Sequence, residues 1–261
     1  MSDILEQIAE HNRMIYLERK LDVSLSKMMD MAYAASGTGF AFEKKLKEDG
    51  MSFICECKKA SPSKGIIAPD FPYLDIAKSY EQAGASCISV LTEPKWFMGS
   101  LDYLEEIASE VQIPVLRKDF TIDEYMIFEA RARKASAVLL ICSILDPKTL
   151  GKYIRLCDEL ELTALVEAHD KNECDMALGE GARVIGVNNR NLRDFTVDPT
   201  NCLRLRDYVG DKAIFVAESG VKCREDVAEL ERSGVDAVLI GESMMRAEDK
   251  KAFLNSLKGI S

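Results

Sequence analysis

The chain has 261 residues, and its 44 Asp and Glu against 34 Lys and Arg give a formal net charge of −10. This length suits one large α/β domain or two small ones, and 47% hydrophobic with 30% charged residues is typical of a globular chain with a substantial core. The negative balance argues against nucleic acid as a partner, because phosphate binding needs a basic face. No apolar run approaches the roughly 18 residues of a membrane span. The polar start MSDILEQIAEH carries no secretory signal, so we expect a cytoplasmic protein that does not bind membranes.

Eight cysteines and two histidines raise the question of metal binding. Only Cys55 and Cys57 are close together, and His11 and His169 are far from both and from each other. This is poor spacing for zinc. We therefore expect no metal site and reduced cysteines that act as small apolar side chains.

The first fifty residues are predicted to be helical. Apolar residues recur at helical spacing from Ile4 to Leu17, a second amphipathic stretch covers 25–35, and 40–47 suits a short third helix. We expect residues 1–50 to form a helical extension packed on a catalytic domain of residues 51–261.

From residue 52 onward, short apolar and β-branched runs alternate with helical patterns. The predicted strands are 52–57, 87–91, 113–118, 137–141, 163–168, 183–188, 213–219 and 237–240. Thr121 with Glu124 predicts a capping box, and Asp146-Pro147 predicts an N-cap followed by proline in the first turn. Three glycines mark helix ends: Gly84, Gly181 and Gly234.

Eight β-then-α units predict parallel strands, because each crossover needs a helix. They favour a single (β/α)8 barrel with an N-terminal helical extension. A doubly wound open sheet is the rival, with fewer strands and usually a glycine-rich first turn. Neither G-x-G-x-x-G nor G-x-x-x-x-G-K-[ST] occurs in the chain.

In a parallel barrel, the residues that end the strands converge on one mouth. Ionisable or polar side chains end five of the predicted strands: Glu56, Lys58, Lys118, Glu167, Asn188, Arg190, Glu218 and Ser219. Glu56 and Lys58 are two residues apart and therefore share one side of a strand. If they face inward, Cys55 and Cys57 face the helix layer. We expect these ionisable side chains to form the charged floor of a functional site.

Glycines follow the last two predicted strands at Gly220 and Gly241, where barrels frequently bind phosphate; two ordinary turns are the alternative. The polar and basic loop 59–65 suits an anion loop, a lid or a plain turn.

Trp96, Phe97 and Phe120 either wall a substrate or pack between helix and barrel. For His169, a helix-start position beside Asp170 is favoured over a general base. The whole set suits proton transfer on a phosphorylated small molecule, with a Schiff-base lysine as an alternative.

Seven segments together are similar to the motifs of the indole-3-glycerol-phosphate synthase family. They are residues 55–65, which contain E-x-K-x-x-S-P-S, and residues 89–93, 114–120, 165–167, 186–192, 217–220 and 239–243. The resemblance implies conversion of 1-(2-carboxyphenylamino)-1-deoxyribulose 5-phosphate to indole-3-glycerol phosphate, carbon dioxide and water in tryptophan biosynthesis. It implies no metal and no organic cofactor.

The resemblance also implies roles for individual residues. Lys118 is the general acid of ring closure, and Glu56, Lys58 and Glu167 share the acid and base steps of dehydration. Asn188 orients polar substrate groups, and Ser219 supports the site. The implied substrate-binding residues are Ser61 and Arg190 for polar groups, Phe97, Phe120, Leu139 and Leu192 for the anthranilate, Gly220, Gly241 and Glu242 for the phosphate, and Glu218 and Ile240 beside them.

Two rivals are weighed against this interpretation. Phosphoribosylanthranilate isomerase would place a catalytic cysteine on the first strand, where Cys55 and Cys57 have the wrong parity. A non-catalytic barrel that binds a phosphorylated ligand would not need the lysine and glutamate set. Lys134 stands where the family often has glycine, and a positive φ there costs on the order of 1 kcal/mol. A monomer is the expected state.

Overall fold

The computed structural model describes residues 4–190 and 195–260. Eight parallel strands close into a barrel in the order β1-β10-β9-β8-β7-β6-β5-β4, which confirms the predicted (β/α)8 fold. The barrel strands are β1 (Ser52–Cys57), β4 (Cys87–Leu91), β5 (Val115–Lys118), β6 (Ala137–Ile141), β7 (Thr163–Ala168), β8 (Val184–Asn188), β9 (Ile214–Glu218) and β10 (Ala237–Ile240).

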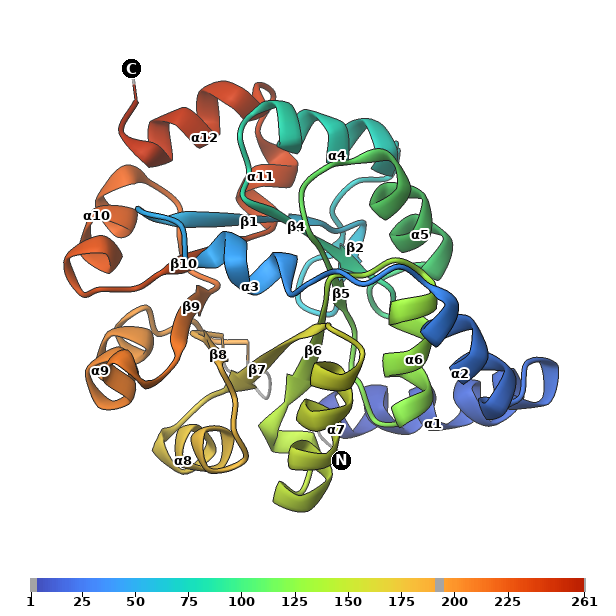
Figure 1. Cartoon of the computed structure of the whole chain (residues 1–261). Coiled ribbons are helices and arrows are strands. Elements are labelled where there is room, and N and C mark those ends of the chain that lie inside the picture. Colours follow the sequence, from blue (N-terminus) through green and yellow to red (C-terminus); the bar gives the residue numbers. More distant parts are fainter. Residues whose placement is uncertain (1–3, 191–194, 261) are drawn as a thin grey trace.

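Helices surround these strands (Figure 1). They are α4 (Tyr73–Gln82), α5 (Leu101–Glu110), α6 (Glu124–Ala132), α7 (Pro147–Glu159), α8 (Lys171–Gly179), α9 (Thr200–Val209), α10 (Arg224–Arg232), α11 (Glu242–Arg246) and α12 (Lys250–Lys258), with 3-10 turns at Cys142–Ile144 and Gly210–Lys212. No helix among these described residues is long and apolar enough to cross a membrane.

All eight predicted strands are present; five have the predicted bounds, and the other three differ by one or two residues at an end. Three of them start later than predicted, at Val115, Val184 and Ile214. Strand β9 stops at Glu218 because Ser219 has a φ of 65°, which turns the chain out of the extended conformation. The loop at 59–65 forms an antiparallel hairpin of β2 (Ala60–Ser61) and β3 (Gly65–Ile66), which the sequence did not predict.

Most of the predicted helix ends are confirmed. Asp146 caps α7, with Pro147 in the first turn, and the three marked glycines have φ of 87°, 93° and 74°. The capping box at Thr121 is wrong. Asp123 caps α6 instead, because its carboxylate directly precedes the helix and accepts from the Tyr125 N–H at 2.9 Å. Lys134 has a φ of 64°, so it carries the expected strain.

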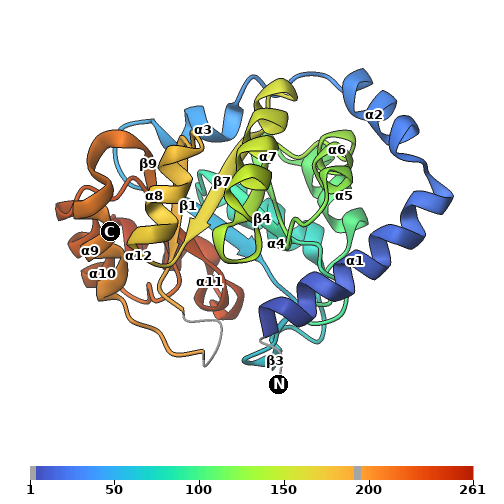
Figure 2. The ribbon, with the colours of Figure 1, turned by 90° about the horizontal axis from the view of Figure 1, so that it is seen from below.

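Three helices precede the barrel: α1 (Ile4–Asp22), α2 (Leu25–Ala34) and α3 (Ala41–Leu46). Figure 2 shows α3 at one end of the barrel and the start of α1, near β3, at the other. Phe42 and Leu46 of α3 pack into the barrel interior and close its N-terminal end. Helix α2 packs against α6 on the outside.

Apolar side chains form two layers, one inside the barrel and one between the strands and the helices. Strand β1 shows the alternation that separates them: Ile54 lies in the inner cluster, and Cys55 and Cys57 lie in the outer one. Glu56 therefore faces inward, as the parity predicted. All eight cysteines are free, and seven of them are buried.

Candidate active site

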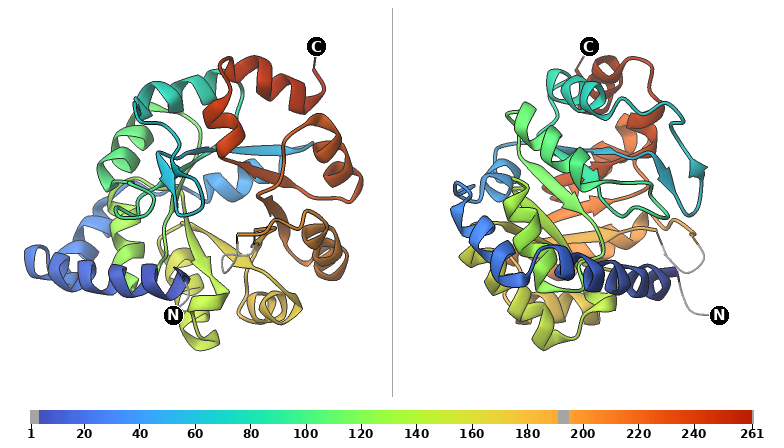
Figure 3. Two further views of the ribbon diagram at one scale, coloured as in Figure 1. Left: turned by 180° about the vertical axis from the view of Figure 1, so that it is seen from behind. Right: turned by 90° about the vertical axis from the view of Figure 1, so that its right-hand side faces the viewer.

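A cavity of about 710 Å³ opens at the C-terminal end of the barrel. The view from behind in Figure 3 shows the β2–β3 hairpin and the loops that gather at this end. Every predicted site residue except one lines the cavity: Glu56, Lys58, Ser61, Phe97, Lys118, Phe120, Leu139, Glu167, Asn188, Arg190, Glu218, Ser219, Gly220, Ile240, Gly241 and Glu242. The exception, Leu192, lies outside the described residues.

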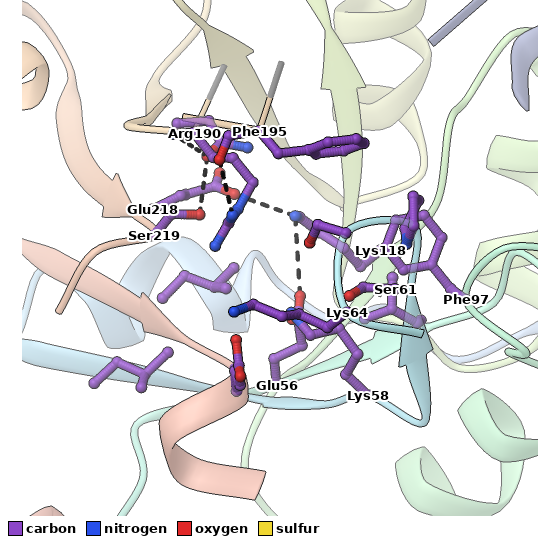
Figure 4. A pocket seen from close by; sticks show the side chains of 18 of the residues that line it. Glu56, Lys58, Ser61, Lys64, Phe97, Lys118, Arg190, Phe195, Glu218 and Ser219 are labelled. Carbon is purple, nitrogen blue, oxygen red and sulfur yellow. Dashed lines mark hydrogen bonds and ion pairs between the residues drawn. The ribbon is translucent and has the colours of Figure 1, made fainter. Parts of the chain in front are cut away.

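Lys118 is the centre of the cavity floor. Its Nζ lies 3.2 Å from the Glu218 carboxylate and 4.0 Å from those of Glu56 and Glu167. These groups come from β5, β9, β1 and β7, and Figure 4 shows Lys118 between Glu56 and Glu218. Barrel closure thus brings carboxylates from three other strands around the ammonium group carried by β5.

A second cation–carboxylate pair lies beside the first. Lys58 Nζ is 2.5 Å from Glu56 Oε1, while Glu56 Oε2 faces Lys118. One carboxylate therefore bridges the two lysines. Such a bridge gives the floor two proton donors held a few ångströms from one acceptor.

Burial and charge together set the pKa values of these groups. Burial raises the pKa of Glu218 to about 7, with the neighbouring Glu167 and Glu56 adding to the effect of burial and Lys118 opposing it. Burial also opposes ionisation of Glu56, but Lys58 and Lys118 outweigh it and lower its pKa. The three carboxylates likewise outweigh burial at Lys118 and raise its pKa. The lysine is therefore protonated at neutral pH, and Glu56 is ionised.

Polar groups at the end of β8 hold one another in place. The Asn188 Oδ1 atom accepts from the Ser219 hydroxyl and from the Arg190 N–H, both at 3.0 Å. Arg190 also donates to the Phe195 carbonyl at 3.2 Å. Asn188 is therefore fixed by two neighbours, and the amide keeps its orientation toward the cavity.

The aromatic wall is formed by Phe97 and Phe120, whose rings lie 5.9 Å apart at an interplanar angle of 37°. The buried Glu93 carboxylate accepts from three consecutive N–H groups, at residues 95–97, and so fixes the turn that carries Phe97. Trp96 is not among the residues that line the cavity; it packs edge-on against His11 at 5.2 Å. Of the three aromatic candidates, two thus face the cavity.

Sequence reasoning missed the contribution of α1. Ile4, Leu5 and Ile8 line the cavity, so the N-terminal extension forms part of its wall. Asn12 anchors the helix by donating to the Asp119 carboxylate and to the Phe120 carbonyl, both at 3.0 Å. No sequence signal separates such residues from an ordinary packing face, because apolar helical spacing is the same in both.

A buried arginine strengthens this anchor. Arg117 lies on the outward side of β5 and hydrogen-bonds the Tyr16 hydroxyl of α1. It also pairs with Asp119 at 3.3 Å and with Glu129 of α6 at 3.0 Å. The network ties α1 to the strand that carries Lys118, which accounts for the position of the helix over the mouth.

The corner after β9 and β10 contains the two predicted glycines. A Cβ at Gly241 would lie 2.4 Å from Glu56 Oε1 and 2.7 Å from Lys58 Nζ, so any larger residue would displace the ends of these two side chains. Three cations also line the cavity: Lys64, which belongs to the basic loop 59–65, and Lys222 and Arg246, which sequence reasoning did not single out. The corner combines small residues with positive charge.

Within residues 4–190 and 195–260, no group of three His, Cys, Asp or Glu side chains is arranged to hold a metal ion. His169 lies outside the cavity lining, one residue before the Asp170 N-cap of α8, and contacts Glu167 and Glu173.

A (β/α)8 barrel with two lysines and three carboxylates converging at its mouth is the architecture of a barrel enzyme. The family model described as indole-3-glycerol phosphate synthase matches residues 5–257. The chain belongs to the indole-3-glycerol phosphate synthase family, and it has the activity of this carboxy-lyase of tryptophan biosynthesis.

Relatives support the assignment over nearly the whole chain. The indole-3-glycerol phosphate synthase of Ruminiclostridium cellulolyticum is 51% identical over 257 residues, which cover 98% of this chain and 99% of that protein. The enzyme of Leuconostoc mesenteroides is 46% identical over 259 residues, with the same two coverages.

Solved structures of more distant barrels agree in fold. The 3-hexulose-6-phosphate synthase of Salmonella typhimurium is 16% identical, with a TM-score of 0.64 over 80% of this chain and 97% of its own. The phosphoribosylanthranilate isomerase of Thermotoga maritima is 15% identical, with a TM-score of 0.56 over 81% and 100%. At such low identity these matches show the shared fold alone.

Proposed function

We propose that the two lysine–carboxylate pairs of the cavity floor divide the reaction between them. Lys118, surrounded by Glu218, Glu56 and Glu167, serves ring closure, and the Lys58–Glu56 pair serves dehydration. The observation that carries this division is the pairing itself, with Lys118 Nζ 3.2 Å from Glu218 and Lys58 Nζ 2.5 Å from Glu56.

In ring closure, the anthranilate carbon that bears the carboxylate attacks the ribulose carbonyl. The carbonyl oxygen gains negative charge as the new carbon–carbon bond forms, and Lys118 donates a proton to it. The raised pKa of Lys118 keeps this proton available at neutral pH. Loss of carbon dioxide then returns the electron pair of the broken bond to the ring and restores its aromaticity.

In dehydration, the hydroxyl formed in the first step leaves as water. Lys58 donates the proton that this oxygen needs, and Glu56 accepts a proton from the neighbouring methylene carbon. The lowered pKa of Glu56 keeps it ionised and therefore able to act as a base. The indole double bond forms from the electron pair of the broken carbon–hydrogen bond.

Binding of the substrate follows the chemistry of the walls. The anthranilate ring lies between Phe97, Phe120 and Leu139, with the α1 side chains Leu5 and Ile8 covering it. The phosphate lies at the corner after β9 and β10, where the small and cationic residues are Gly220, Gly241, Lys64, Lys222 and Arg246. Ser61, Arg190, Ile240 and Glu242 complete the polar and apolar contacts.

We also propose that residues 1–50 form the extension and 51–261 the catalytic domain, and that the enzyme works as a monomer in the cytoplasm. Seven buried free cysteines suit a reducing compartment. Size-exclusion chromatography with light scattering tests the monomer.

The role of Lys118 is tested by steady-state kinetics, with indole fluorescence reporting product. Lys118→Met removes the ammonium group, and we expect kcat to fall at least about 10²-fold. Lys118→Arg keeps the charge that the three carboxylates require, yet we expect it to be slow as well, because guanidinium stays protonated and does not recycle a proton. Lys251→Met, an exposed substitution on α12, is the matched control.

The competing interpretation is that Lys118 only attracts the anionic substrate. In that case Lys118→Arg would restore kcat/KM, and Lys118→Met would raise KM while kcat stays intact. Either result would remove the general-acid assignment.

A further inference from the structure

His169 follows Glu167 by two residues and contacts it without lining the substrate cavity. Its Nε2 atom is 3.4 Å from Glu167 Oε1. Both atoms are buried, and neither has a hydrogen-bond partner elsewhere in the described part of the chain. The other oxygen of the same carboxylate, Oε2, faces Lys118 Nζ at 4.0 Å. Glu167 therefore uses one oxygen toward the imidazole and presents the other to the floor of the cavity.

The imidazole is held in turn by α8. His169 Nδ1 lies 3.0 Å from Glu173 Oε2, and the same oxygen accepts from the His169 backbone N–H at 2.7 Å. The Asn201 side chain of α9 donates to the His169 carbonyl at 3.1 Å. Asp170 caps α8 and fixes Glu173 by accepting from its N–H at 2.9 Å. Two helices thus leave the ring little freedom to rotate.

We infer that His169, held by Glu173, is a positioning residue that fixes the orientation and the ionised state of Glu167 for the reaction. This inference rests on the proposed function, in which Glu167 faces the general acid Lys118, and extends it to a pair of residues that do not line the cavity. The order along the line is Glu173, His169, Glu167 and Lys118, in which charges alternate in sign. In such a line each charged group is stabilised by neighbours of opposite charge, and the whole line is more stable than the same groups would be as separate ion pairs.

The electrostatic environment agrees with this arrangement. The charged groups that face His169 are Glu167 from β7 and Glu173 from α8, and Asp170 lies beside it at the helix start. Burial lowers the pKa of His169, but the two glutamates outweigh burial and raise it to about 10. Burial likewise raises the pKa of Glu167, and His169 together with Lys118 lowers it below its usual value. The ring is therefore a cation at neutral pH, and Glu167 is an anion.

The test is the pH profile of kcat for His169→Ala. We expect kcat at the optimum to fall about 10-fold or more through loss of orientation, with KM changed less than about threefold. The acidic limb of the profile should move up by about one pH unit, because Glu167 loses an opposite charge within 4 Å. His169→Gln, which also lacks the positive charge, should move the limb in the same direction, and it serves if His169→Ala does not fold. Asp175→Asn, also on α8 but bonded to Tyr208 at the surface, is the matched control.

The shift of the acidic limb decides the outcome. If kcat falls while the limb stays in place, His169 has a merely structural role and the inference is overturned; an unchanged profile overturns it as well. Glu167→Gln, measured alongside, separates this result from the proposed mechanism. A fully active Glu167→Gln enzyme would remove the role of Glu167 itself, whereas an inactive one combined with normal His169→Ala kinetics would remove only the positioning role.

Discussion

Gly186 on β8 offers a sharp test of the carboxylate cluster, because it leaves room for Glu218. A Cβ at this position would lie 2.4 Å from Glu218 Oε1 and 3.2 Å from Leu165 Cδ1. Ordinary contact begins near 3.4 Å, so in Gly186→Ala the Glu218 oxygen must move by about 1 Å. That oxygen belongs to the carboxylate that pairs with Lys118 at 3.2 Å.

We expect two measurable consequences of Gly186→Ala. A displacement of about 1 Å at a catalytic group costs on the order of 10²-fold in rate, so kcat should fall by roughly this factor. Overpacking of the barrel interior should also lower the free energy of unfolding by about 1–3 kcal/mol. Indole fluorescence measures the first effect, and chemical denaturation measures the second.

The control is Gly179→Ala at the end of α8, where an added Cβ meets no atom within 4 Å. We expect its kcat to be unchanged and its stability to rise by up to about 1 kcal/mol. Adding Glu218→Asp to Gly186→Ala shortens the crowded side chain, so stability should recover while kcat remains low. A Gly186→Ala enzyme with parental kcat and stability would refute the contact on which this reasoning depends.

Three further predictions concern the same site. Glu218→Gln should stabilise the protein relative to the parent by up to about 3 kcal/mol above pH 7, and should have no such effect below pH 4.5. The reason is that the folded-state pKa of Glu218 is raised to about 7, so the stability of the parent is full at low pH and falls as the pH rises through that value. Thermal melting from pH 4 to 9 measures the difference. Gly220→Ala should chiefly raise KM, by about tenfold, because it crowds the phosphate corner at a φ of 97°. Gly241→Ala should also lower kcat, because its Cβ collides with the Lys58–Glu56 pair. Equal effects on kcat in both variants would contradict the phosphate assignment. Dialysis against EDTA should leave turnover unchanged, and activity that is lost and then restored by a divalent ion would show that the enzyme needs a metal.

Much of the fold follows from local sequence patterns. Continuous apolar runs identify strands buried on both faces, and strand alternation alone assigns Glu56 to the inside and Cys55 to the outside. Helix caps also follow from local sequence. The cap of α6 was nevertheless assigned to Thr121 and not to Asp123, because both residues can cap a helix and they lie within one turn of each other. The residues that line the cavity could be predicted from the motifs at the strand ends, because these ends meet at one mouth in any parallel barrel.

Other features were decided only by the tertiary structure. Which carboxylate lies 3.2 Å and which 4.0 Å from Lys118 depends on the register of four strands that are far apart in the chain. The cover of the cavity by α1 depends on Asn12 reaching Asp119, 107 residues away. A helix that packs on a core and a helix that lines a substrate cavity have the same apolar period in their sequences. The distance between two charged side chains is likewise not determined by either residue alone. These relations exist only once closure of the barrel has fixed the strands against one another.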